Sequence, residues 1–231
     1  KGCDMTRTPL LALAALALAG AAAFWIARPA PGPGPGSGAA ELLPMAAQAQ
    51  EAAEIDTSTV QEMALGAADA PVTVIEYASF TCPHCATFHA DVLPQLKADY
   101  IDTGEVRFVH REVYFDRYGL WAGMVARCGG EERYFGIADL IYEKQREWTR
   151  GEPTDVVASL RRIGKTAGLT DEQLDACLSD GDKAQALVAW YQQNAEEDGI
   201  ESTPSFVIDG RKYSNMPYSD FVEIIDDKLG G

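Results

Sequence analysis

The spacing of hydrophobic and polar residues along this chain switches between strand and helix patterns. Apolar, β-branched residues at 72–77 predict a strand, and apolar residues at helical spacing predict a helix from Cys85 to about Tyr100. Alternation of apolar and polar residues at 106–113 predicts a second strand. We therefore expect a β-α-β unit in this part of the chain.

A long helical segment and a hairpin follow this unit. From Leu120 to Glu197 one helical pattern follows another, with glycine-rich breaks between them and no strand pattern. Two short strand patterns, 205–208 and 211–214, then flank Asp209-Gly210, a strong signal for a tight hairpin, and 218–229 predicts a closing helix. This order predicts an α/β fold with an all-helical domain inserted before the final β-hairpin and C-terminal helix.

The beginning of the chain has the composition of a targeting segment followed by a linker. A basic start leads into an apolar run that ends at Ile26, so we expect residues 1–28 to be a signal peptide or an N-terminal membrane anchor. Residues 29–58 are rich first in Pro and Gly and then in Ala and Gln, which favours a linker. Export predicts a location in the periplasm, which is an oxidising compartment.

The remaining residues are expected to form two parts. Residues 59–118 together with 200–231 carry the strand patterns, and 119–199 would form the inserted helical domain. Near the terminus, Met5 stands where an initiator residue would stand. We therefore expect residues 1–4 to lie outside the native chain and Cys3 to carry no function.

Net charge narrows the classes of partner. The 231 residues include 19 Lys and Arg against 35 Asp and Glu, which gives a formal net charge of −16. Because such a chain repels polyanions, we expect no nucleic-acid partner. The length is sufficient for a hydrophobic core that does not depend on disulfides, and we expect a monomer.

The sequence Cys82-Pro83-His84-Cys85 carries the clearest chemistry. Two cysteines separated by two residues, between a predicted strand and a predicted helix, form the layout of a dithiol/disulfide redox site. At the helix start, unpaired backbone N–H groups and the helix dipole would stabilise a Cys82 thiolate. Pro83 suits the first helical position, His84 can add a donor or a positive charge, and Cys85 is expected to be the less exposed, resolving thiol.

A zinc half-site is the competing interpretation of this motif, because Cys-X-X-Cys also begins many metal modules. His89 stands four residues after Cys85 and could serve as a third ligand, but a second ligand pair at suitable spacing is missing. We therefore expect no metal and no cofactor, with His89 as a surface or partly buried residue. His110 lies in a predicted strand and is assigned no role.

Glu76 is the next candidate, since a carboxylate inside an apolar strand is costly to bury without a partner or a task. Burial would raise the pKa of this carboxyl and suit it to exchange a proton with Cys85. The alternative is a strand-end carboxylate that reaches solvent or pairs with Arg or Lys. The sequence leaves both interpretations open.

Three stretches together resemble the DsbA-type thiol:disulfide oxidoreductases, which have a thioredoxin-like fold. They are Gly66 to Tyr77, Phe80-Thr81-Cys82-Pro83-His84-Cys85 and Ser202-Thr203-Pro204-Ser205-Phe206, and the resemblance covers residues 60–231. It implies a buried acid at Glu76 beneath the active site. It also implies a cis Thr203–Pro204 bond beside the cysteines, with the Thr203 backbone free to pair with substrate and its hydroxyl near the sulfurs.

Cys128 and Cys177 both fall in the predicted helical domain. In an oxidising compartment they would most simply form a structural disulfide, and two buried free thiols are the alternative. Nothing around either residue resembles an activating helix start. We do not expect a second redox centre.

These observations predict a periplasmic enzyme that introduces disulfides into exported proteins by dithiol–disulfide exchange at Cys82 and Cys85. The resemblance implies reduced exported proteins as substrates and an inner-membrane, quinone-linked, DsbB-like partner that reoxidises the pair. A disulfide isomerase or a thiol reductase for one dedicated client is the alternative within redox chemistry. From another class, a chaperone-like binding module would contain the cysteine pair only as structure.

Overall fold

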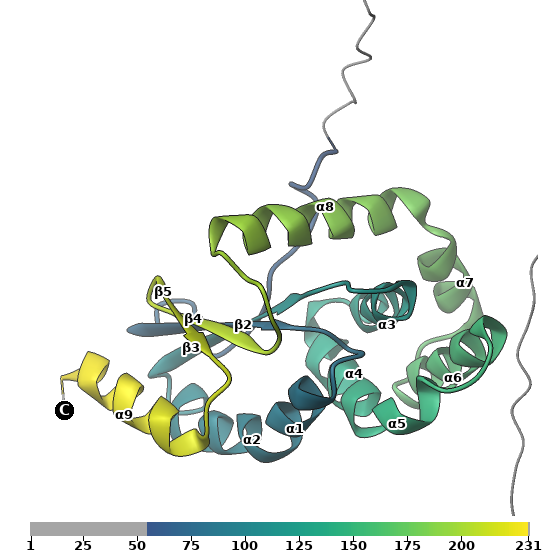
Figure 1. Cartoon of the computed structure of the whole chain (residues 1–231). Coiled ribbons are helices and arrows are strands. Elements are labelled where there is room, and N and C mark those ends of the chain that lie inside the picture. The colour runs from purple at the N-terminus through teal and green to yellow at the C-terminus, as the bar shows by residue number, and fades with distance from the viewer. Residues whose placement is uncertain (1–54, 231) are drawn as a thin grey trace, which may run out of the picture. The chain divides into compact units, whose positions relative to one another are not determined.

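A five-stranded mixed sheet lies between helices that cover its two faces (Figure 1). The computed structural model describes residues 55–230, and its strands are β1 (Met63–Leu65), β2 (Val72–Ala78), β3 (Val106–Glu112), β4 (Ser205–Ile208) and β5 (Arg211–Ser214). The order across the sheet is β1-β3-β2-β4-β5. Neighbours β2 and β3 are parallel, and the other neighbouring pairs are antiparallel.

The helices fall into two groups. One group packs on one face of the sheet and consists of α1 (Pro83–Asp91), α2 (Leu93–Leu96), the π-helical turn η1 (Lys97–Ile101) and α9 (Tyr218–Leu229). The other group lies between β3 and β4 in sequence and consists of α3 (Arg117–Cys128), α4 (Glu131–Glu143), α5 (Gln145–Trp148), α6 (Pro153–Thr166), α7 (Asp171–Ser179) and α8 (Gly181–Glu197). The expected α/β fold with a helical insertion before the hairpin and last helix is confirmed.

The predicted single helix from Cys85 to about Tyr100 is wrong in one respect. Helix α1 ends at Asp91, α2 begins at Leu93, and the chain continues as the π-helical turn η1. Pro94 explains the break, because it has no backbone N–H to donate and its ring crowds the preceding turn. The strand β1 was not expected, since three residues are too few to show a pattern.

The two faces of the sheet differ because side chains alternate along each strand. On the face that α1, α2 and α9 cover, Val74 and Phe108 pack against Phe88 and Phe221 in one apolar cluster. Glu76 follows Val74 by two residues, so its side chain also points towards this helical layer. Its partner in the parallel β2–β3 register is His110, which shares that face.

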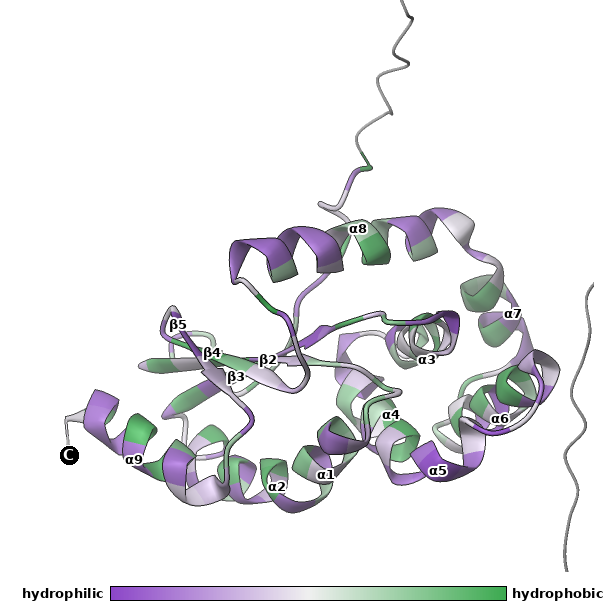
Figure 2. Cartoon of the chain, viewed as in Figure 1, coloured by the Kyte–Doolittle hydropathy of each residue, from purple (hydrophilic) through white to green (hydrophobic). Residues whose placement is uncertain are grey.

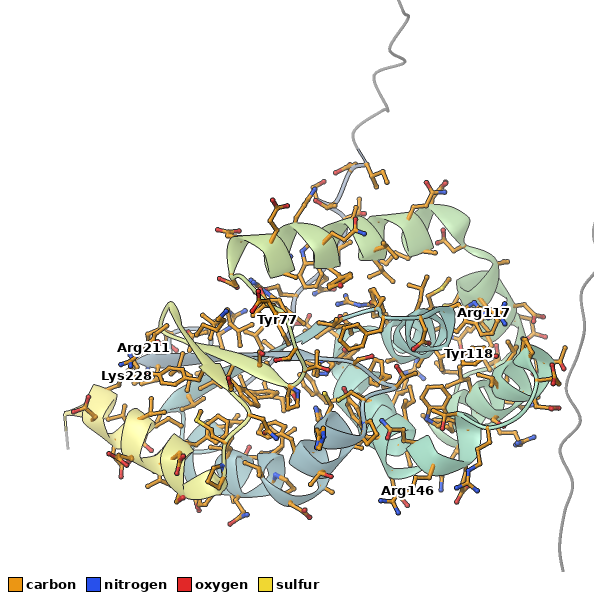
Figure 3. The ribbon with its side chains drawn as sticks, in the orientation of Figure 1. Tyr77, Arg117, Tyr118, Arg146, Arg211 and Lys228 are labelled. Atoms are coloured by element: carbon orange, nitrogen blue, oxygen red, sulfur yellow. A yellow bond between two sulfur atoms is a disulfide. The ribbon has the colours of Figure 1, made fainter. Side chains whose placement is uncertain are left out.

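The opposite face of the sheet is covered by α8 (Figure 1). Here Tyr77 is fully buried, Figure 3 shows it beneath α8, and its hydroxyl is hydrogen bonded to Asp198. Arg111 donates to the same hydroxyl and forms ion pairs with Glu62 and Asp198. Figure 2 shows polar residues on the outer side of α8, as expected for a surface helix with one packed face.

The inserted helices form their own apolar cluster, which reaches helix α1. Phe80 and Cys85 belong to the same cluster as buried residues of α4 and α6. A buried ion pair lies at its edge, where Arg127 Nε and Glu112 Oε1 are 2.7 Å apart. The Tyr134 hydroxyl also donates to Glu112, at 2.8 Å. This network fixes α3 and α4 against the end of β3.

The predicted signal or anchor segment, and the linker up to residue 54, lie outside the described residues. Among residues 55–230, each helix is too short or too polar to cross a bilayer.

Candidate active site

The two cysteines lie where strand β2 passes into helix α1. Cys82 is the N-cap residue of α1, with extended backbone angles of φ −83° and ψ 120°, and Pro83 occupies the first turn. Proline is favoured there because the first helical N–H has no intrahelical partner. The Cys82 side chain is partly exposed, whereas Cys85 is fully buried, and both are free thiols.

The surroundings of Cys82 favour its thiolate. The pKa of Cys82 is lowered to about 5, chiefly by a hydrogen bond from the Cys85 thiol. Partial burial opposes this shift, while hydrogen bonds from the Thr203 side chain and the first-turn backbone N–H groups add to it. The thiol also donates to the Thr203 carbonyl, with Sγ and O 3.4 Å apart, and this contact favours the protonated form. The contacts that favour the anion outweigh it.

Cys85 has the opposite character. Burial, together with hydrogen bonding to Cys82 and the nearby Glu76 charge, raises the pKa of Cys85 well above that of an ordinary thiol. At neutral pH the pair therefore consists of an accessible thiolate and a buried thiol. This is the division between attacking and resolving cysteine that dithiol–disulfide exchange needs.

A turn from the far end of the chain completes the exposed side of the site. The Thr203–Pro204 peptide bond is cis and directly precedes β4, which pairs with β2 from Tyr77 to Val74. This pairing brings Thr203 to the Cys82 sulfur. Two segments 121 residues apart in sequence thus form one surface.

The helical insertion also holds the cysteine loop, through a residue that the sequence did not single out. Gln145 of α5 is buried, and its Nε2 donates to the Phe80 carbonyl at 2.8 Å and to the Cys82 carbonyl at 2.9 Å. On the other side, the Thr81 hydroxyl donates to Asp116 at 2.8 Å. An isolated glutamine in a helical pattern gives no sign of this role.

Glu76 lies under α1 and is completely buried. Its Oε2 lies 2.9 Å from Nε2 of His89, a buried residue one turn after Cys85 on α1, while its Oε1 finds no hydrogen-bond partner among residues 55–230. The alternative of a solvent-reaching carboxylate, or one paired with Arg or Lys, is therefore wrong. The partner is a histidine, because the even-numbered positions of β2 face α1.

His89 is more deeply placed than its position in the sequence suggested. Burial opposes its charge, but the Glu76 carboxylate, with Asp139 also contributing, raises the pKa of His89 to about 9. The ring therefore carries a positive charge next to a negative one. His89 Nδ1 lies 3.8 Å from Asp139 of α4, whose side chain is 63% exposed.

His110 closes this buried group from β3. Its Nδ1 lies 2.7 Å from the Tyr134 hydroxyl and its Nε2 lies 3.2 Å from the Tyr142 hydroxyl. Burial lowers the pKa of His110 to about 3, so the ring is neutral. Ligand-type atoms of Glu76, His89 and His110 lie within 4.8 Å of one another. Both His110 nitrogens are engaged by tyrosines, and we treat the group as a hydrogen-bond network.

His84 is exposed, and a groove opens beside it. Within the described residues its contribution to Cys82 is its backbone N–H, and no hydrogen bond of its imidazole is found. The adjoining cavity, about 330 Å³, is lined by His84, Thr87, Phe88 and Met216 among others. The predicted role of the His84 side chain stays a prediction.

Cys128 and Cys177 lie away from this site and form a disulfide between α3 and α7, with Cα atoms 5.9 Å apart. Its structural role stays a prediction. The predicted catalytic and substrate-facing residues Glu76, Cys82, Pro83, His84, Cys85, Thr203 and Pro204 are gathered around the start of α1. Sequence reasoning missed Asp139 and Gln145, and it considered His89 only as a metal ligand or as a surface or partly buried residue. The position of His89 four residues after Cys85, on the same helix face, was the available signal.

Comparison with known proteins agrees with this geometry. A family model described as thioredoxin matches residues 58–227. A putative protein-disulfide oxidoreductase of Rickettsia bellii is 34% identical over 166 residues, covering 71% of this chain and 63% of that protein. Disulfide bond formation protein D of Bacillus subtilis is 26% identical over 196 residues, covering 80% and 84%. The chain thus spans just under two thirds of the Rickettsia relative.

Solved structures give the same result for the fold. Alpha-DsbA1 of Wolbachia pipientis superposes with a TM-score of 0.68 and 28% identity, covering 74% of this chain and 92% of that one. Oxidised BdbD of Bacillus subtilis gives a TM-score of 0.66 and 24% identity, over 74% and 94%. The first supports a relationship, and the second shows the fold alone.

Proposed function

This chain belongs to the thioredoxin family, and we propose that it is a DsbA-type protein dithiol:disulfide oxidoreductase that uses Cys82 and Cys85. One observation carries the proposal: a partly exposed cysteine with a pKa of about 5 stands at a helix start, three residues before a buried cysteine with a raised pKa. A structural or metal-binding pair has no need of this asymmetry.

The reaction follows from the two thiols. In the oxidised protein a substrate thiolate attacks Cys82 Sγ, the bond between Cys82 and Cys85 breaks, and Cys85 leaves as a thiolate that takes up a proton. A second substrate thiolate attacks the substrate sulfur of the mixed disulfide and releases Cys82 as a thiolate. The substrate loses two electrons and the cysteine pair gains them.

Substrate would lie along the cis-proline turn and the groove next to it. The Thr203 backbone stands beside the Cys82 sulfur, where an extended peptide can pair with it. The groove lined by His84, Phe88 and Met216 can take an apolar side chain of the same peptide. Glu76 is the buried acid that exchanges a proton with Cys85.

The direction of reaction is proposed to be oxidation of substrate. A thiolate at Cys82 stabilises the reduced form of the pair, which makes the disulfide form a stronger oxidant. Together with the apolar N-terminal sequence, this supports a periplasmic enzyme that introduces disulfides into exported proteins. We propose that a membrane-bound, quinone-linked DsbB-like partner reoxidises it and that the enzyme acts as a monomer.

A matched pair of variants tests the catalytic assignment. Cys85→Ser should accumulate mixed disulfides with an unfolded protein substrate that carries a disulfide, because the Cys82 thiolate can attack that bond, one substrate sulfur leaves as a thiolate, and no thiol at position 85 remains to release the complex. Cys82→Ser, which makes the same chemical change three residues earlier, should trap none. Equal trapping by both variants, or by neither, would reject the assignment and leave a binding module with a structural cysteine pair.

The direction is tested by the reduction potential against glutathione. The cysteine pair of an oxidase should have a reduction potential well above the value of about −270 mV that is typical of thioredoxin. A potential as low as that of thioredoxin would favour the alternative, a thiol reductase for one dedicated client. Refolding of a scrambled-disulfide substrate, together with sedimentation, separates a monomeric oxidase from an isomerase.

A further inference from the structure

The buried thiol of this site has no direct access to solvent. Cys85 and Glu76 both have an exposed fraction of 0%. In each catalytic cycle Cys85 must gain one proton when the disulfide is reduced and lose one when it reforms. Glu76 can exchange that proton with the thiol, but it cannot exchange it with water.

His89 provides the link to the surface. One ring nitrogen, Nε2, lies 2.9 Å from Glu76 Oε2, and the other, Nδ1, points towards Asp139 at 3.8 Å. Nδ1 is buried and has no hydrogen-bond partner in the part of the chain that the structure describes, while the Asp139 side chain is 63% exposed. Each end of the ring therefore faces a carboxylate, one inside the protein and one at the surface.

A groove reaches this point from outside. It lies between α1, α2 and α4, has a volume of about 700 Å³, and is lined by His89, Asp139 and Tyr142 among others. Most of its wall is apolar, from residues such as Leu93 and Phe135. It lies across α1 from the groove beside His84.

We propose that His89 carries protons between Glu76 and this α1–α4 groove, so that Cys85 exchanges its proton with solvent away from the surface where substrate binds. This inference rests on the proposed function. His89 acts through Glu76 and does not touch the reacting sulfur atoms. It is a positioning residue that connects the site to water.

The protons balance over the two half-reactions. When the disulfide is reduced, the doubly protonated His89 gives its Nε2 proton to the Glu76 carboxylate, Glu76 passes a proton to the Cys85 thiolate, and the ring is left neutral with its proton on Nδ1. When the pair is reoxidised, the Cys85 proton returns through Glu76 to Nε2, and the ring is doubly protonated again. The ring exchanges protons with solvent through Nδ1, which faces the Asp139 side, and no rotation of the imidazole is needed.

The charged and titratable groups around His89 fit this role. Glu76 on β2 and Asp139 on α4 favour a doubly protonated ring, the species through which the proton passes, and the pKa of His89 is raised to about 9. His110 on β3 is neutral, and Tyr142 stacks on the His89 ring at 4.1 Å between centroids. Lys97 and Glu143 line the groove further out.

The test isolates the step in which Cys85 loses its proton. Reduced protein is mixed with glutathione disulfide, the reaction is quenched with acid, and mass spectrometry follows the formation and decay of the Cys82–glutathione mixed disulfide. His89→Gln can keep a hydrogen bond to Glu76 but cannot pass a proton. We expect the mixed disulfide to live roughly tenfold longer, below the 10²–10⁴-fold effect of losing a direct general base.

Asp139→Asn tests the outer end, at a surface position that leaves the His89–Glu76 contact in place. It should prolong the mixed disulfide severalfold, and the solvent deuterium isotope effect on its decay should grow. The control is Glu143→Gln, the same change one turn further along α4, where the side chain pairs with Lys144 at 3.9 Å. It should decay at the wild-type rate.

Rescue separates proton transfer from packing. In His89→Ala, imidazole added to the solution should enter the α1–α4 groove and restore the decay rate, which a purely structural role would not allow. If the mixed disulfides of Asp139→Asn and His89→Gln both decay at the wild-type rate, or if imidazole does not speed the decay in His89→Ala, the inference is overturned and the proposed function stands. If the wild-type protein forms no mixed disulfide, the proposed function itself fails.

Discussion

Removing the Cys85 thiol should raise the pKa of Cys82. The pKa of Cys82 falls from an ordinary value of 9.0 to about 5, and the hydrogen bond from Cys85 is the largest contribution. A hydrogen bond to a charged group is worth about 1.5–3 kcal/mol, or roughly 1–2 pKa units. Because Cys82 is partly exposed, solvent reduces this to about 1 unit. We expect the Cys82 thiolate of Cys85→Ala to titrate near pH 6.

Thiolate ultraviolet absorbance, recorded against pH, measures this value directly, and the pH dependence of alkylation by iodoacetamide is an independent check. Cys85→Ser is the matched control, since its hydroxyl can still donate to Cys82 and should keep the pKa near that of the wild type. If the pKa of Cys82 in Cys85→Ala equals that of the wild-type protein, the contact with the Cys85 thiol does not activate Cys82. If Ser and Ala raise the pKa equally, the effect comes from packing.

Three further predictions concern stability. The pKa of Cys82 is lower in the folded protein than its ordinary value of 9.0, so ionisation of Cys82 stabilises the folded state. This stabilisation is complete above pH 9 and is lost as the pH falls towards 5. Denaturant unfolding gives the free energy of unfolding of the reduced and the oxidised protein, and their difference should shift against the reduced form by about 1 kcal/mol from pH 7 to 5. This figure is already reduced for the partial exposure of Cys82. A difference that stays constant with pH would refute the prediction. Arg127→Met leaves the buried Glu112 carboxylate without its ion-pair partner, so urea unfolding should show a free energy of unfolding lower by about 3 kcal/mol or more. The double variant Arg127→Met/Glu112→Leu should recover much of this stability. Replacing Cys128 and Cys177 by Ser opens a loop with a sequence separation of 49, so thermal unfolding should report a loss of about 4 kcal/mol at most, while an altered Cys82 titration would show coupling to the active site.

The sequence was sufficient for features that depend on local pattern. The hairpin around Asp209-Gly210 and the helix at 218–229 match the structure, because turn chemistry and hydrophobic spacing act over a few residues. The helix predicted after Cys85 is longer than α1, because Pro94 interrupts the helical pattern and α1 ends before it. Local pattern is therefore reliable for the presence of an element and less so for its end.

Contacts between distant segments were harder to predict. The position of Thr203 at Cys82 came from a family resemblance, since 121 residues separate the two. The burial of Glu76 against His89 depends on which face of β2 meets α1, and that face is fixed only when β3 and β4 pair with it. Gln145 is one polar residue in a helical stretch and becomes informative only once α5 is placed.

The two hydrogen bonds from Gln145 to the carbonyls of Phe80 and Cys82 connect the inserted helices directly to the Cys82 loop, the segment between β2 and α1. A loop held only by its own strand and helix would be free to fray at its tip. Here the carbonyl of Cys82 is anchored by α5, so we expect local opening of the helical insertion to loosen the Cys82 loop as well. We therefore expect the helical part and the sheet to open together at this point, so that the rate of Cys82 alkylation would report on the integrity of both.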